Sequence, residues 1–199
     1  MGFEFYAHPV CEIHWTPKTQ KDDRHMKKMT HKNLSISLRI ERLLWLMVYF
    51  VFFRFSPNVL FAYRTWLLKL FGAKIARGAH IYPNCLIWIP RNLVMHENSC
   101  IGPRSIVYNV SLIEIGQGAT VSQGCHLCTA SHDFERDFQL ISAPIHIGDG
   151  AWVSSECFIS PGVTVGTNAV AYARTVIHRD LEPGSIYASA NLKKVRERK

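Results

Sequence analysis

The sequence predicts an all-β solenoid, because a six-residue pattern repeats through most of the chain. From Ile75 to Ile177 an aliphatic residue returns every six positions, with two slips of two residues and one longer interruption. The fifteen aliphatic positions are Ile75, Ile81, Ile87, Met95, Ile101, Val107, Ile115, Val121, Leu127, Ile147, Val153, Ile159, Val165, Ala171 and Ile177. A period of six is a multiple of the strand period of two, whereas it cannot keep one face of a helix with 3.6 residues per turn. We therefore expect fifteen short strands joined by tight turns.

Two further features support these units. A small residue follows four places after eight of the aliphatic positions, and we expect it to point inward as well: Ala79, Cys85, Ser99, Ser105, Ala119, Cys125, Cys157 and Ala169. Glycine directly follows the aliphatic residue in four units: Ile101-Gly102, Ile115-Gly116, Ile147-Gly148 and Val165-Gly166. We expect these glycines to relieve crowding at corners and to supply positive φ.

Length and charge narrow the class of protein. With 199 residues, 48% of them hydrophobic, the chain fits one globular domain with a buried core. The net charge of +8 divides into +2 for residues 1–35, +4 for 36–71, −1 for 72–174 and +3 for 175–199. Because the basic residues lie toward the ends and no nucleic-acid-binding motif occurs, we expect anionic lipid or a phosphorylated small molecule as partner, and no nucleic acid.

The chain before the repeats divides into two parts. Residues 1–33 are basic and are expected to form a loose tail, and residues 34–72 have an amphipathic helical pattern, divided by Pro57, with a second piece at 59–71. The apolar stripe of this segment can pack on the prism or can lie in a membrane interface, and both alternatives stay open. The longest uncharged apolar run, residues 43–53, is too short to cross a bilayer.

The six cysteines are expected to be reduced thiols of a cytoplasmic protein. The first ten residues lack the sustained apolar core of a signal peptide. Cys125 and Cys128 have the spacing of half a zinc knuckle, but no second pair with that spacing follows. Since Cys125 also occupies the small inward position of its unit, we expect no metal here.

The repeat is interrupted most strongly after Ser131-His132-Asp133, where residues 133–144 leave the coil. Long excursions from compact folds are commonly binding loops. His132 is expected at the root of this excursion, at a coil corner, where a general base can be held in position. Imidazole titrates in the range that such a base needs near neutral pH.

The residues around this break resemble a known family. The stretches Leu127-Cys128-Thr129-Ala130-Ser131-His132-Asp133-Phe134 and Pro144-Ile145-His146-Ile147-Gly148-Asp149-Gly150-Ala151-Trp152-Val153 are similar to hexapeptide-repeat O-acetyltransferases, of the colanic acid biosynthesis branch. The resemblance covers about residues 36–199. It implies a left-handed parallel β-helix of about five coils over residues 73–190, three units per coil, with a basic C-terminal tail at 191–199. It also implies acetyl-CoA as co-substrate and a homotrimer.

The resemblance places roles on individual residues near the break. His132 is the general base and Asp133 binds the acceptor. Asn109 holds a sugar hydroxyl, although stabilisation of a turn explains this residue equally well. Trp152 lines the pantetheine arm, with a core or trimer contact as the alternative. Ser155 supplies a main-chain N–H to the thioester oxygen and so stabilises the oxyanion.

Further cofactor contacts fall near the C-terminus: Ala173, His178, Arg179, Lys193 and Arg196. Cations suit the pyrophosphate and ribose phosphate of coenzyme A. Two stretches depart from the pattern of the relatives, Ser189-Ala190-Asn191-Leu192 and His178-Arg179-Asp180. Both departures bear on how tightly coenzyme A is bound.

Three functions follow from these observations. The preferred one is transfer of acetyl from acetyl-CoA to a hydroxyl of a sugar or lipid-linked oligosaccharide, without metal and without an acyl-enzyme, in the cytoplasm or at the cytoplasmic face of the inner membrane. A zinc hydrase like the gamma-class carbonic anhydrases is the second, with His126, His132, His146 and His178 as candidate ligands. The third is a scaffold without catalytic activity that works through its N-terminal stripe.

Overall fold

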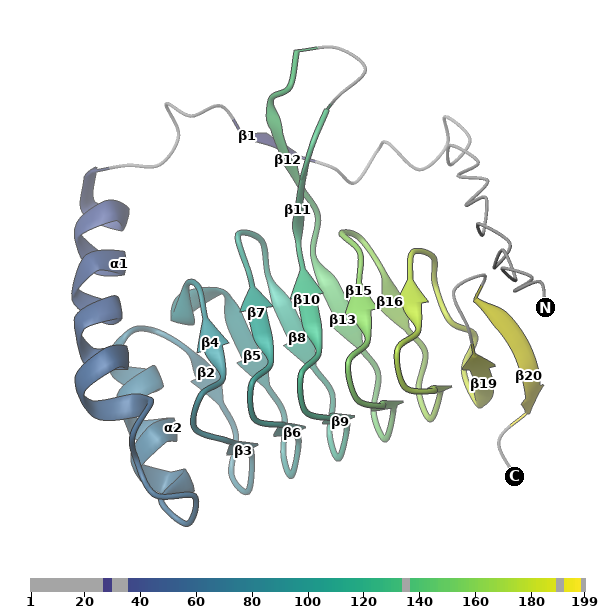
Figure 1. Ribbon diagram of the computed structural model, residues 1–199, viewed down its shortest axis with the longest axis horizontal. Coiled ribbons are helices and arrows are strands. Elements are labelled where there is room, and N and C mark those ends of the chain that lie inside the picture. The colour runs from purple at the N-terminus through teal and green to yellow at the C-terminus, as the bar shows by residue number, and fades with distance from the viewer. Residues whose placement is uncertain (1–26, 30–35, 134–136, 189–191, 198–199) are drawn as a thin grey trace, which may run out of the picture.

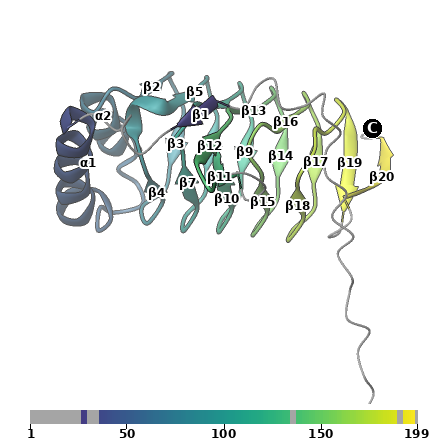
Figure 2. The same cartoon turned by 90° about the horizontal axis from the view of Figure 1, so that it is seen from above.

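The chain forms a three-sided prism of stacked coils with helices at one end (Figures 1 and 2). The computed structural model describes residues 27–29, 36–133, 137–188 and 192–197. The first face consists of β2 (Lys74–Ile75), β5 (Leu93–Met95), β8 (Ile113–Ile115), β13 (Ile145–Ile147) and β16 (Thr164–Val165). The second consists of β3 (His80–Ile81), β6 (Cys100–Ile101), β9 (Thr120–Val121), β14 (Trp152–Val153), β17 (Val170–Ala171), β19 (Ser185–Ala188) and β20 (Lys193–Glu197). The third consists of β4 (Leu86–Ile87), β7 (Ile106–Tyr108), β10 (His126–Cys128), β15 (Phe158–Ile159) and β18 (Val176–Ile177).

The strands of each face pair in parallel with those of the next coil, so that residues about one coil apart are in register. Five coils contribute a strand to all three faces, as predicted. A partial sixth follows: Leu181 bridges to Val165 on the first face, and β19 pairs with β17 on the second. The first slip of the repeat is a short 3-10 helix, η4 (Pro90–Asn92), which widens one corner.

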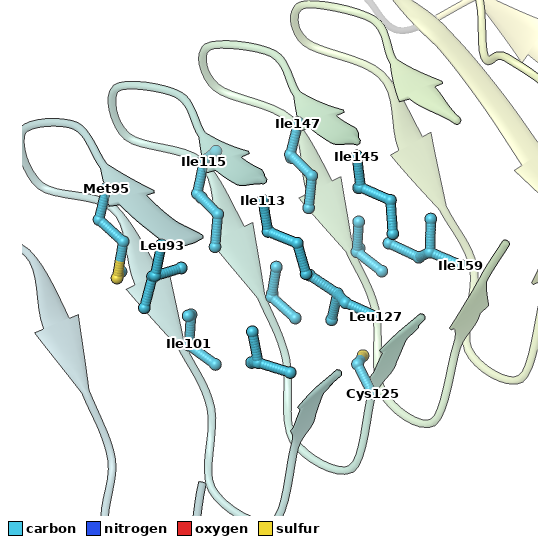
Figure 3. Close-up of a cluster of buried hydrophobic side chains, with 14 of the residues drawn as sticks. Leu93, Met95, Ile101, Ile113, Ile115, Cys125, Leu127, Ile145, Ile147 and Ile159 are labelled. Atoms are coloured by element: carbon cyan, nitrogen blue, oxygen red, sulfur yellow. The ribbon is translucent and has the colours of Figure 1, made fainter. Parts of the chain in front are cut away.

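All fifteen predicted aliphatic positions and all eight predicted small positions are buried in the prism. Figure 3 shows how Leu93, Ile113 and Ile145 from successive coils point into the same interior. The corner glycines are needed for space, as predicted: a Cβ on Gly148 would lie 2.6 Å from the Thr167 main-chain nitrogen. The expectation of positive φ at the four glycines is wrong, since the described glycines with positive φ are others, such as Gly118 and Gly150.

Helices α1 (Ile36–Val48), η3 (Tyr49–Phe53, a π-helix) and α2 (Phe61–Leu70) close the N-terminal end of the prism. Trp45, Tyr49 and Phe53 are buried against the first coil, and the Trp45 Nε1–H donates to the Ile87 carbonyl at 2.7 Å. One side of this segment therefore packs on the coils. None of the described helices is long and apolar enough to cross a membrane.

A buried arginine joins the helices to the first coil. The Arg64 guanidinium donates to the carbonyl oxygens of Ile81, Pro57 and Asn58 at 2.6–2.7 Å, and is completely buried. Burial lowers the pKa of Arg64. Because three carbonyl oxygens replace its water, this cation fixes the turn between the two helices against the prism.

The excursion is an antiparallel hairpin that rises from the edge between the third and first faces (Figure 1). Its strands are β11 (Ala130–His132) and β12 (Leu140–Ser142), and β12 also pairs with β1 (Lys27–Met29). The chain leaves the coil at Ala130, before the predicted start at residue 133. His132 consequently lies at the outer end of a strand and not at the root of the excursion. Part of the predicted loose tail is a strand of this small sheet; the rest of residues 1–33 lies outside the described residues.

The C-terminus also differs from the prediction. Residues 193–197 form β20, antiparallel to β19, where a basic tail was expected. Leu192 is completely buried before this strand. The main-chain hydrogen bonds between β19 and β20 override the polar composition of Lys193–Glu197, because an edge strand can keep its side chains in water. The departure at Ser189-Ala190-Asn191 lies outside the described residues.

Candidate active site

His132, the predicted general base, lies on the hairpin and is oriented by a main-chain contact. Its Nδ1 lies 2.9 Å from the Phe138 carbonyl oxygen, on the opposite side of the hairpin. A carbonyl oxygen only accepts hydrogen bonds, so Nδ1 carries the proton in this contact, and in the neutral imidazole the lone pair is then on Nε2. The side chain is exposed. The imidazole is thus oriented by a main-chain atom and can accept a proton from a bound molecule at Nε2.

Main-chain hydrogen bonds hold the hairpin next to this histidine. The Asp133 N–H donates to Gln139 O at 2.9 Å, and the Phe138 N–H donates to Asp133 O at 2.8 Å. At the base of the hairpin, Thr129 Oγ1 donates to Tyr108 O at 2.9 Å. Asp133, the predicted acceptor-binding residue, is half-buried directly beside the base.

Asn109 has the geometry of the turn-stabilising alternative. Its Oδ1 accepts from the Ile89 N–H at 2.9 Å and its Nδ2 donates to the Ile89 carbonyl at 2.7 Å, and the residue is completely buried. The amide therefore replaces strand pairing where the first slip interrupts the repeat. The side chain is enclosed and both ends of its amide are bound to Ile89, so these contacts favour the turn-stabilising alternative, and the role of Asn109 toward a sugar hydroxyl stays an untested prediction.

A second group of predicted residues lies on another edge of the prism. Trp152 projects outward from β14, 45% exposed, and its Nε1–H donates to Ser122 Oγ at 3.0 Å. Ser155 and Ala173 lie in successive turns between the second and third faces, where the Arg174 N–H donates to Ser155 O at 2.9 Å. Among the described residues, no acceptor binds the Ser155 N–H. The exposed Trp152 indole and the Ser155 N–H thus belong to the same coil.

The predicted cationic residues lie at the C-terminal end of the prism. His178 and Arg179 follow β18 and are exposed, and Arg179 Nη2 donates to the Leu192 carbonyl at 3.0 Å. Lys193 and Arg196 project from β20 into solvent. Arg179 therefore has a structural contact besides any contact with a phosphate, since it binds the segment that leads into β20.

The structure does not bring all these residues together within one chain. The His132 hairpin rises between the third and first faces, whereas Ser155 and Ala173 lie between the second and third faces. Two different edges of the prism therefore carry the base and the proposed cofactor wall.

The residues considered for metal binding are also dispersed. His126 lies on the third face, His146 on the first and His132 on the hairpin. Cys125 Sγ lies in the core, 3.0 Å from the Ser154 carbonyl, and Cys128 Sγ lies 3.1 Å from the Ala130 carbonyl. Within the described ranges, no three His, Cys, Asp or Glu side chains are grouped so that they could hold a metal ion.

Two features of this surface were missed in the sequence. The Phe138 carbonyl that orients His132 is a main-chain atom and leaves no signal in the residue types. On the first face, Glu114 binds His96 Nε2 at 2.7 Å and His146 Nδ1 at 3.2 Å, beside a hollow of about 400 Å³. The hydrogen bond from His96, followed by that from His146, lowers the pKa of Glu114 against the effect of its partial burial. His96, Glu114 and His146 lie at outward positions about one coil apart, and this spacing could have indicated in the sequence that they are neighbours.

Comparison with known proteins agrees with this architecture. No family model matches the chain. The Escherichia coli K12 protein named colanic acid biosynthesis acetyltransferase WcaF is 36% identical over 149 residues, which cover 74% of this chain and 81% of that protein. A maltose O-acetyltransferase from Clostridium difficile 630 has a TM-score of 0.76 at 20% identity, covering 87% of this chain and 100% of the other. A hexapeptide-repeat acetyltransferase from Vibrio cholerae O1 biovar eltor, solved with acetyl coenzyme A, has a TM-score of 0.75 at 20% identity, covering 83% and 91%.

The prism and its interrupted repeat are those of the hexapeptide-repeat acetyltransferases, which are left-handed parallel β-helices, and the chain belongs to this family. It is an acetyl-CoA-dependent acetyltransferase. Within the family, its sequence is similar to the colanic acid biosynthesis branch.

Proposed function

We propose that this chain transfers the acetyl group of acetyl-CoA to a hydroxyl of a sugar, with His132 as general base. The observation that carries this proposal is the hydrogen bond between His132 Nδ1 and the Phe138 carbonyl, which in the neutral imidazole puts the lone pair on Nε2. A sugar hydroxyl is almost fully protonated at neutral pH, so its attack on a thioester needs such a base. The acetyl-CoA complex of a relative in fold supports the donor.

The proposed step needs only His132, the Ser155 N–H and the two substrates. Nε2 of His132 accepts the proton of the sugar hydroxyl while the hydroxyl oxygen forms a bond to the carbonyl carbon of the thioester. The tetrahedral intermediate carries an oxyanion, for which the Ser155 N–H is the proposed donor. The C–S bond then breaks, and the proton passes from Nε2 to the sulfur, which yields the acetyl ester and free coenzyme A. No acyl-enzyme is formed.

The remaining predicted residues keep their roles as proposals. Asp133 binds the acceptor beside the base, and Trp152 lines the pantetheine arm. The proposed phosphate and cofactor contacts are Ala173, His178, Arg179, Lys193 and Arg196. An acceptor from polysaccharide synthesis, as a free or lipid-linked sugar, is supported by the name of the relative in Escherichia coli. The five described cysteines are free thiols, which supports a cytoplasmic location.

We also propose a homotrimer, because the base and the cofactor wall lie on different edges of one prism. In a closed ring of three chains, the hairpin of each chain faces the Trp152 edge of its neighbour. Mixing subunits tests this arrangement. His132→Asn chains and Trp152→Ala chains, each inactive alone, should recover about a quarter of wild-type activity when assembled together at equal amounts. Recovery of no activity would show that each site lies within one chain.

The base is tested by His132→Asn, which retains an N–H donor for the Phe138 carbonyl but cannot accept the proton. We expect kcat for acetyl-CoA-dependent ester formation to fall by about 100-fold or more, with unchanged thermal midpoint and unchanged binding of coenzyme A. His126→Asn, on the strand β10 that precedes the hairpin, is the matched control and should keep the wild-type rate. Equal rates for both variants would exclude His132 as the base.

A further inference from the structure

The helical segment at the N-terminal end is apolar on two opposite sides. One side, with Trp45, Tyr49 and Phe53, packs on the first coil. The other side is an exposed stripe with helical spacing along α1, η3 and the turn that follows them: Ile36, Ile40, Leu43, Leu44, Met47, Phe50, Val51 and Phe55. A helix that only closes the solenoid needs one apolar side, and a polar outer side would serve it better in water. The second stripe therefore indicates a second apolar environment.

Helix α2 adds to the same end of the molecule. Trp66 is 55% exposed and Leu70 is 61% exposed, and Val59 before the helix is 80% exposed. Both views show α1 and α2 side by side at the end of the prism (Figures 1 and 2). We call the exposed apolar residues of 36–70 the cap surface. Among the residues that the structure describes, thirteen of the twenty exposed large hydrophobic side chains belong to this segment, so the described apolar surface is concentrated at one end.

The charges on this segment are almost all positive. Arg39, Arg54 and Lys69 are exposed around the cap surface. The one acidic residue between positions 36 and 71, Glu41, is paired with Arg91 of the prism. A cap surface that contains Phe50 and Trp66 and is bordered by exposed cations has the pattern of helices that lie in the interface of an anionic bilayer. A second copy of the chain would instead bring the same cations face to face.

The cap surface also faces away from the coils, so it can contact a flat surface such as a bilayer. The helices lie across the end of the prism, and the coils extend away from them on the other side (Figure 1). If the chain forms the proposed trimer with parallel prisms, three cap surfaces lie in one plane. Three weak contacts on one particle bind a surface far more strongly than one contact does. This step alone depends on the proposed assembly.

We propose that the cap surface docks the protein on an anionic lipid bilayer, with the apolar stripe of α1 and η3 in the interface and Arg39, Arg54 and Lys69 at the headgroups. The prism then stands with its long axis away from the membrane plane. The docked chain does not cross the bilayer.

Co-sedimentation of the full chain with vesicles tests the proposal. We expect binding to vesicles of phosphatidylcholine with phosphatidylglycerol, and weaker binding at high salt or with phosphatidylcholine alone. The variant with Leu43→Asn, Val51→Asn and Phe55→Asn should bind at least about tenfold more weakly, because three exposed apolar contacts are removed. Replacement of Arg39, Arg54 and Lys69 by Gln should remove the preference for anionic lipid. Ile106→Asn with Val195→Asn is the matched control, since both residues are exposed and lie outside the cap surface.

Two results would overturn the proposal. In the first, the Leu43, Val51 and Phe55 variant binds anionic vesicles as well as the wild type, or the wild type does not bind them. In the second, the wild type without lipid sediments as a larger assembly than this variant, so that a second copy covers the cap surface. Acetyl transfer to a soluble sugar is measured in parallel, and we expect the cap variant to keep it. Loss of vesicle binding and loss of activity are therefore separate outcomes.

Discussion

The coils and the hairpin differ in how they are held together and in where their side chains lie. In the coils, side chains such as Ile113 and Leu127 are fully buried, and each strand is locked between the strands of two neighbouring coils. The hairpin has its key side chain, His132, in solvent, and its shape depends on a few main-chain hydrogen bonds and on β1. The difference predicts that the stability of the coils and the position of the proposed base depend on separate parts of this chain. Substitutions in one part should leave the other property nearly unchanged.

The largest expected effect is on the stability of the coils. Ile115→Ala removes most of a fully buried side chain, and we expect the free energy of unfolding to fall by about 2–5 kcal/mol, because the packed neighbours cannot close the cavity. Denaturant unfolding measures this. Ile106→Ala on an outward position is the control and should change it by about 0.5 kcal/mol or less. The molecules of Ile115→Ala that remain folded should keep the wild-type kcat. A lower kcat in these folded molecules would show that coil packing and activity are not independent.

The next expected effect is a loss of catalytic rate with little change in stability. Deletion of residues 1–29 removes β1 from the hairpin sheet, so β12 and with it His132 are held less firmly. We expect kcat to fall by about tenfold, since small displacements of a base are costly, while the thermal midpoint changes little. Deletion of residues 1–26 keeps β1 and is the matched control. If both deletions have the same kcat, then β1 does not position the base.

The smallest effect compares one substitution at two threonines, both fully buried. Thr175 Oγ1 is buried in the last full coil without a hydrogen-bond partner among the described residues. Thr175→Val should therefore raise the free energy of unfolding by about 1 kcal/mol. Thr129 Oγ1, at the base of the hairpin, binds Tyr108 O and accepts from the Ser111 N–H, so Thr129→Val should lower it by about 1–3 kcal/mol. Thermal unfolding of both variants should show opposite signs, and equal signs would contradict the assignment of their partners.

The coils could be predicted in detail from the sequence because their pattern is local. The inward positions repeat at a fixed spacing, and Ile75 and Ile177, more than a hundred residues apart, obey the same rule. The break at Ser131-His132-Asp133 was visible for the same reason, since any departure from a regular period stands out.

Contacts between distant segments left no such signal. Residues 27–29 carry no apolar pattern of their own, and they become a strand because β12 offers an unpaired edge. Residues 193–197 pair with β19 although their composition is typical of a solvated tail. Asn109 could be recognised as important but not assigned, because its role depends on Ile89, whose main chain lies one coil away. The residue roles on the Trp152 edge stay predictions, since they concern contacts with coenzyme A and not contacts within this chain.

The strand β20 has a consequence for how these molecules behave in a crowded solution. A stack of parallel strands with an open end is a template on which another molecule can add, and a solenoid with two open ends could grow into a fibre. Here α1 and α2 cover the first coil, while β20 runs antiparallel over the last strand of the second face and places Lys193, Lys194, Arg196 and Glu197 along that end. Its direction breaks the parallel order and its charges repel an identical edge. The second face is thereby terminated, and the chain is protected against end-to-end polymerisation along it.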